Sequence, residues 1–178
     1  VYNMSGTDKI IWADGANNAS SYDNSSVTDI NATGAPSNPK YVKIFRNHAF
    51  YAGMSATPQK VIFSAPYAEG DFSAANGAGS ISVTGTITGL KVFRDELYIF
   101  CQRRIYKVTG TSSSNFALAE VAKNVGTIAH HSIQEVSGDL LFLSADGIRT
   151  VAGTERIGDV ELGTVSKQIQ DRINDITY

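Results

Sequence analysis

The side chains of this sequence that could do metal or nucleophilic chemistry are three histidines and one cysteine. A metal site needs several ligands converging on one point, but His48 lies far along the chain from the adjacent pair His130 and His131. Adjacent residues on a strand point to opposite faces, so this pair is poorly placed to share a metal. Cys101 has no disulfide partner and follows an apolar run, which favours a buried structural thiol. We therefore predict no metal site and no cofactor.

The acidic residues fall mostly in turns. Asp95, Asp139 and Asp146 each lie in or beside a turn between apolar runs, where turn chemistry alone explains their type. The carboxylates between 153 and 163 lie in a segment punctuated by glycine and are expected to be solvated. Neither a nucleophile elbow nor a phosphate-binding glycine loop occurs. We predict no catalytic residues, and a hydrolase using Asp95, Asp139 and Asp146 is the enzyme alternative.

The sequence lacks the usual features of two further classes of protein. The net charge of the 178 residues is −2 and no run of lysine or arginine occurs, so the basic footprint of a nucleic-acid-binding protein is absent. No apolar stretch approaches the length of about 20 residues that a bilayer-spanning helix needs. Charged residues make up only 18% of the chain, and serine, threonine, asparagine and glycine supply much of the remaining polar character.

A short polar turn followed by two apolar strands occurs three times along the chain. The copies are 45–52 with 60–64, 93–100 with 104–108, and 136–143 with 147–151. The second strands, taken at Val61, Ile105 and Ile148, lie 44 and 43 residues apart. A period of this length with several strands per unit is typical of a β-propeller blade. We predict a mainly β fold built from β-propeller-like blades of antiparallel strands, forming a partial propeller.

The segment 9–13 resembles another second strand, 51 residues before the one at 60–64. Its partner strand is expected upstream of Val1. Three units and a remnant are too few for most closed propellers, which favours a piece of a longer polypeptide. The alternative is a complete small β-domain whose hairpins are only loosely alike.

Two regions differ from the repeats. The segment 17–40 is mostly small and polar, and we predict a long surface loop there within a β region spanning 1–152. The region 153–178 is predicted to be a loop and a C-terminal amphipathic helix. Its narrow apolar stripe provides candidate assembly contacts at Val165, Ile169, Ile173 and Ile176.

Short strand and turn segments of this sequence resemble the β-propeller portion of a bacteriophage tail structural protein. The family is the nozzle or tail tubular protein B class of short-tailed phages. The resemblance begins at Asn47-His48-Ala49-Phe50-Tyr51-Ala52-Gly53 and continues at 62–66, 71–73, 87–90, 97–100 and 143–148. It covers roughly residues 41–152 and contains no catalytic signature.

This resemblance implies a virion protein, assembled in the host cytoplasm, that works by assembly. Its expected partners are further copies in a ring and other tail proteins. Viral DNA would pass nearby through the exit channel without sequence-specific binding. The alternative function is a carbohydrate- or receptor-binding β-module of a virion or extracellular protein, with Tyr22 and Tyr67 contacting sugar.

Overall fold

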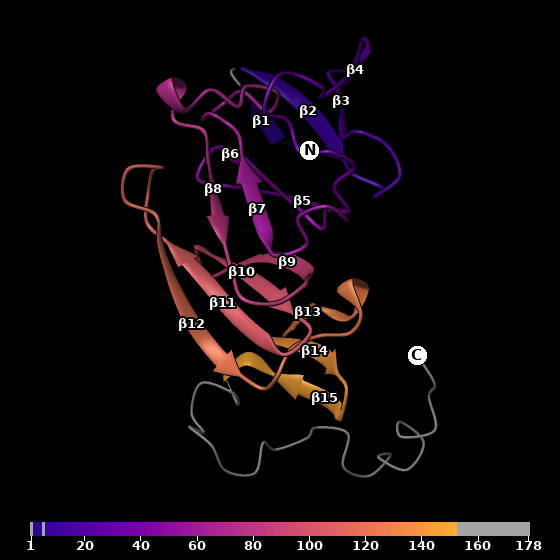
Figure 1. The fold of residues 1–178 in the computed structure, drawn as a ribbon, viewed down its shortest axis with the longest axis vertical. Helices are drawn as coiled ribbons and strands as arrows, with labels where there is room; N and C mark the ends of the chain where they lie inside the picture. The colour runs from indigo at the N-terminus through magenta and orange to yellow at the C-terminus, as the bar shows by residue number, and fades with distance from the viewer. Residues whose placement is uncertain (1, 5, 153–178) are drawn as a thin grey trace.

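The computed structural model describes residues 2–4 and 6–152, which form four antiparallel sheets following one another along the longest axis (Figure 1). The first sheet contains β1 (Tyr2–Met4), β2 (Thr7–Trp12), β3 (Ser20–Tyr22) and β4 (Val27–Asp29). The second contains β5 (Tyr41–Phe45), β6 (His48–Ala52), β7 (Lys60–Phe63) and β8 (Gly79–Ser82). The third contains β9 (Ile87–Phe93), β10 (Glu96–Cys101), β11 (Arg104–Thr109) and β12 (Ala117–Lys123). The fourth contains β13 (Gln134–Val136), β14 (Asp139–Ser144) and β15 (Gly147–Thr150).

The predicted mainly β character is therefore confirmed, and each sheet is a meander of strands in chain order. Two short 3-10 helices, η1 (Ala74–Asn76) and η2 (His130–Ser132), lie between the strands. The helix predicted within 153–178, with its stripe of apolar residues, lies outside the described residues.

The turn that opens each sequence repeat is a two-residue hairpin turn. Both central residues have positive φ in all three copies, namely Arg46 and Asn47, Arg94 and Asp95, and Ser137 and Gly138. Positive φ at both positions defines a type I′ turn, whose twist matches that of the strands that it joins. The three predicted repeats thus correspond to β5–β7, β9–β11 and β13–β15.

The interior sheets are apolar on both faces because each of these sheets packs between two others. In β10, Leu97 and Ile99 belong to the core shared with the second sheet. Tyr98 and Phe100 alternate with them and belong to the core shared with the fourth sheet. A third core lies between the first and second sheets, where Tyr51 is fully buried. Strands covered on both faces have continuous apolar runs rather than alternating ones, which explains the apolar strands of the repeats.

An arginine in two of the hairpin turns reaches the turn of the next sheet. Arg46 Nη2 donates to the backbone oxygen of Asp95 at 3.3 Å, and Arg94 Nη2 donates to the backbone oxygen of Gly138. Each guanidinium also lies over the phenylalanine that precedes it, at 5.5 Å for Arg46 and 5.0 Å for Arg94. The repeated Phe-Arg pair therefore links consecutive sheets at equivalent corners.

The prediction of a long surface loop at 17–40 is wrong in part, because this segment contains the hairpin of β3 and β4. Its apolar content is small, but Ala19 and Ile30 are buried against the second sheet. The Ile30 N–H also donates to the Ala19 carbonyl at 2.8 Å. An isolated two-stranded hairpin is only marginally stable, and pairing with β2 adds a further strand to this one.

We predicted a partner strand upstream of Val1 for this region, but the structure pairs β2 with β1, a strand within the chain. β1 pairs with β2 in register Tyr2↔Lys9 and Met4↔Thr7. Gly6 lies in the connection with φ of +83°, a conformation that glycine adopts at little cost. Residues 9–12 of the strand predicted at 9–13 belong to β2, which pairs with β1 on one side and with β3 on the other.

Candidate functional site

The three carboxylates of the enzyme alternative do not converge. Asp95 and Asp139 lie beside neighbouring turns, whereas Asp146 lies at the opposite end of β14, a strand about 20 Å long. Asp139 Oδ1 accepts from the backbone N–H groups of Leu140 and Ala152, at 2.7 and 3.1 Å. These contacts give Asp139 a structural task at the start of β14.

Asp146 forms an ion pair with Arg149, whose side chain is almost completely buried. Arg149 Nε donates to Asp146 Oδ1 at 2.8 Å, and Nη2 donates to Oδ2. Hydrogen bonding from Arg149 holds the pKa of Asp146 below its ordinary value. Asp146 is therefore ionised at neutral pH and is unsuited to the role of a general acid.

An open cleft of about 530 Å³ lies between the β10–β11 and β14–β15 turns. The described residues that line it are Thr88, Gln102, Arg103, Asn124, Ile128, Ser144, Ala145 and Asp146. Among the described residues, Asp146 is the single carboxylate that lines the cleft, whereas glycoside hydrolysis uses a pair. The described lining of the cleft therefore does not contain the carboxylate pair of a glycoside hydrolase.

The histidines and the cysteine have separate structural surroundings. His48 is buried among aromatic rings, with Nδ1 2.6 Å from the Ser64 carbonyl oxygen. His130 and His131 lie in η2, and no group of three potential metal ligands occurs among residues 2–4 and 6–152. Cys101 is fully buried, and burial raises the pKa of its thiol to about 12. A thiol with so high a pKa is not nucleophilic at neutral pH.

The outer face of the first sheet exposes large apolar side chains. Ile10 lies opposite Tyr22, and Tyr22 lies opposite Val27, so the three share one face. Trp12 is two residues beyond Ile10 and shares that face. Ile10, Trp12 and Val27 are 47%, 40% and 61% exposed, whereas Ile11 between them is buried against the second sheet. We call the side chains of Ile10, Trp12, Tyr22 and Val27 the first-sheet face.

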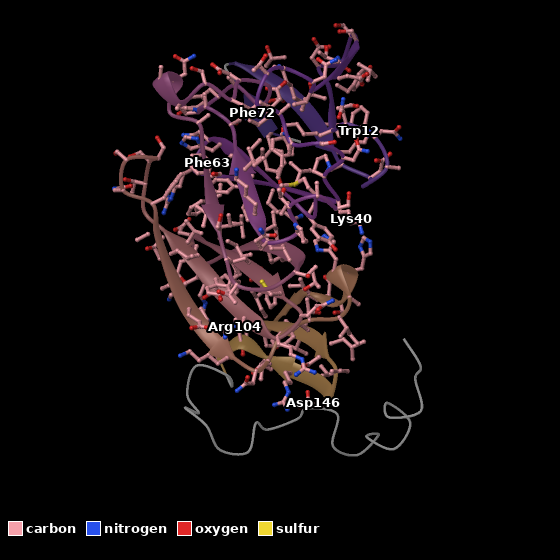
Figure 2. The ribbon with its side chains drawn as sticks, viewed as in Figure 1. Trp12, Lys40, Phe63, Phe72, Arg104 and Asp146 are labelled. Atoms are coloured by element: carbon pink, nitrogen blue, oxygen red, sulfur yellow. The ribbon has the colours of Figure 1, made fainter. Side chains whose placement is uncertain are left out.

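The fourth sheet has an apolar outer face at the other end of the stack. Val136 of β13 is exposed, and Leu141, Leu143 and Ile148 are half-buried. The last two lie directly opposite each other on β14 and β15. We call these four residues the fourth-sheet face. Figure 2 shows Trp12 and Asp146, from the first sheet and the β14–β15 turn, toward opposite ends of the molecule.

The residues predicted for sugar contact come from different sheets. Tyr22 belongs to the first-sheet face, and Tyr67 follows the second sheet's β7. Tyr67 is 50% exposed, and its hydroxyl accepts from Asn47 Nδ2 at 2.8 Å. Sequence reasoning missed the first-sheet face, although Ile10, Ile11 and Trp12 are apolar at successive positions, which predicts apolar groups on both faces of β2.

The assembly contacts predicted at Val165, Ile169, Ile173 and Ile176 lie outside the described residues. Along the part of the chain that the structure describes, no helix is long and apolar enough to cross a bilayer. No protein-family model matches this chain, and no curated protein is significantly similar to it.

Proposed function

We propose that this chain is a structural component of a bacteriophage tail, acting by assembly into a ring around the DNA exit channel. The observation that carries the proposal is the exposed apolar first-sheet face at the end of a stack of sheets. Inside the stack, faces of this kind are covered by a neighbouring sheet. An exposed apolar patch on a sheet marks an interaction surface.

The finer fold within this proposal is an arc of β-propeller-like blades. Each described sheet is an antiparallel meander that packs face to face on the next, as propeller blades do. Figure 1 shows β5, β9 and β13 following one another along one side of the molecule, with β8 and β12 on the other. The first strands would then line the inner rim of the arc.

The occupant that we propose for the first-sheet face is the fourth-sheet face of a second copy. Both surfaces are apolar sheet faces, and they lie at opposite ends of the stack. A contact between two different surfaces of the same chain is heterologous, and it generates a closed ring when the rotation per subunit is suitable. The C-terminal stripe at 165–176 remains a predicted second contact.

Light scattering coupled to size exclusion, with negative-stain images of the peak, tests this proposal. We expect a symmetric ring for the chain and a monomer for Val27→Asp, because the substitution puts a charge into the contact. Leu118→Asp is the matched control, since Leu118 is 40% exposed on β12, outside both faces, and the ring should persist. A monomeric parent chain would contradict the proposal.

The predicted stripe is tested separately with Ile169→Asp combined with Ile173→Asp. If the stripe contributes, this variant loses the ring while its circular dichroism keeps the β signature. An intact ring would exclude the stripe from the contact.

The alternative, carbohydrate binding, has one observation in its favour. The half-exposed indole of Trp12 on a sheet face is suited to stacking on a sugar ring. A glycan array with the parent chain and Trp12→Ala separates the two functions. Selective glycan binding that is lost in the variant would favour the binding module over the ring.

A further inference from the structure

Basic side chains gather where the first strands of the second and third sheets meet. β5 and β9 belong to different sheets but lie side by side, and η2 packs against β9. Lys43 lies at the centre of β5, opposite Phe50, and Lys91 lies in β9, opposite Tyr98. Both lysines are half-buried.

His130 packs against β5 and β9, the strands that carry these two lysines. Its ring centroid lies 4.6 Å from that of Tyr41 on β5 and 5.2 Å from that of His131. Gly89 on β9 leaves room for the ring, since a Cβ there would come within 2.8 Å of His130 Nδ1. The histidine therefore bridges β5 and β9, and its position depends on the absence of a side chain at Gly89.

The positive charge of this cluster is not compensated among the described residues. Burial and then the charge of Lys91 lower the pKa of Lys43. Burial, His131, Lys43 and Lys91 together lower the pKa of His130 to about 4. Neither lysine forms an ion pair within residues 2–4 and 6–152, whereas Lys9 and Lys107 each pair with a glutamate.

We propose that Lys43, Lys91, His130 and His131 form a binding site for a phosphate group, either free or carried by a polynucleotide. A phosphate dianion has several acceptor oxygens and can neutralise two ammonium groups at once, which a single carboxylate cannot. The site adds a ligand class to the proposed assembly function and does not depend on it. Because β5 and β9 are the first strands of the second and third sheets, the site lies on the side of the molecule where these first strands meet.

Titration of the isotope-labelled full chain, followed by NMR, tests the site with two probes. Inorganic phosphate at constant ionic strength should shift the amide signals of β5, β9 and η2. It should also raise the pKa of His130, because a bound anion stabilises the imidazolium. The anion thereby offsets the effect of Lys43, Lys91 and His131, which oppose protonation of His130. A short oligothymidine is the second probe.

The two probes separate the sources of the phosphate. Tighter binding of the oligothymidine at these residues assigns the site to a polynucleotide backbone, and equal or weaker binding assigns it to free phosphate. If neither probe moves the signals of these residues, the proposal is wrong. This measurement uses the unaltered chain, so it stands even if a variant fails to fold.

Charge-removing variants provide the specificity control. Lys43→Gln and Lys91→Gln should each weaken binding about tenfold, because each removes a charge-assisted hydrogen bond. Lys123→Gln removes the same charge from an exposed lysine on β12 and should leave the affinity unchanged. Equal losses in all three variants would show attraction to the overall charge and overturn the assigned site.

Discussion

His48 and His130 show at the level of single residues how surroundings decide the role of a histidine. His48 is buried and its Nδ1 lies at hydrogen-bonding distance from the Ser64 carbonyl oxygen. His130 packs against Tyr41, and its Nδ1 is buried without a partner among the described residues. Protonation of His130 is therefore opposed both by burial and by the neighbouring positive charges.

The stability of the chain should fall as the pH is lowered from about 6.5 to about 4. The pKa of His130 is lowered from 6.5 to about 4 in the folded state, so the unfolded chain binds a proton in this range that the folded chain does not. The contribution of the neutral His130 to the free energy of unfolding is complete above pH 6.5 and is lost as the pH falls toward 4. Urea unfolding at a series of pH values measures this dependence.

The matched variants for this pH effect are the two adjacent histidines. His130→Gln should make the fall in stability over this range shallower, because the titrating group is removed. His131→Gln changes an exposed neighbour in the same 3-10 helix and should keep most of the slope. An unchanged slope in His130→Gln would contradict the assignment to His130.

At the level of elements, the sequence predicted the hairpins that carry strong local signals. Continuous apolar runs around Phe50, Phe100 and Phe142 indicated strands, and the polar pairs between runs indicated turns. The hairpin of β3 and β4 was missed because its strands are polar and are stabilised by pairing with β2. Such support comes from tertiary structure and leaves little trace in local composition.

The candidate sites were predictable to a smaller extent. An apolar neighbourhood correctly indicated the burial of Cys101, whereas the hydrogen bonds that Asp139 accepts from Leu140 and Ala152 lie outside the turn that the sequence indicated. The cluster of Lys43, Lys91 and His130 could not be predicted, because the two lysines come from separate sheets and His130 comes from η2. Packing between sheets brings them together, and a single sequence does not specify that packing.

Ile30→Ala should loosen the hairpin of β3 and β4. Ile30 is buried in the core between the first and second sheets, so we expect a loss of about 2–4 kcal/mol in the free energy of unfolding. Hydrogen exchange of the β3 and β4 amides should accelerate more than that of β10. Leu118→Ala is the control, because an exposed leucine should change stability by less than about 0.5 kcal/mol. Unchanged exchange in β3 would show that Ile30 does not hold the hairpin.

At the level of the whole molecule, the structure is a series of sheets in which the described cores each join two consecutive sheets. Stability in such a series depends on the interfaces between neighbours as well as on each sheet. Arg46 and Arg94 add hydrogen bonds between turns across two of these interfaces. They act where the first hairpins of successive sheets meet.

Arg94→Ala should weaken the contact between the third and fourth sheets. It removes a hydrogen bond to Gly138 and the contact with the Phe93 ring, so we expect a loss of about 1 kcal/mol in urea unfolding. Arg103→Ala removes an exposed arginine of the same sheet and should have little effect. Equal losses in both variants would indicate a general effect of charge rather than a link between sheets.

The alternation of β10 between two cores constrains how this chain can accept substitutions. Ile99 and Phe100 are covalent neighbours but fill different cores, so a volume change at one is not offset by a change at the other. Compensation for Ile99 can come from its own sheet, as at Leu90 directly opposite, or from Val61 in the second sheet, whereas Phe100 packs against Phe142 of the fourth sheet. Over evolutionary time, the positions that change together should therefore include pairs about forty residues apart, roughly one repeat along the chain.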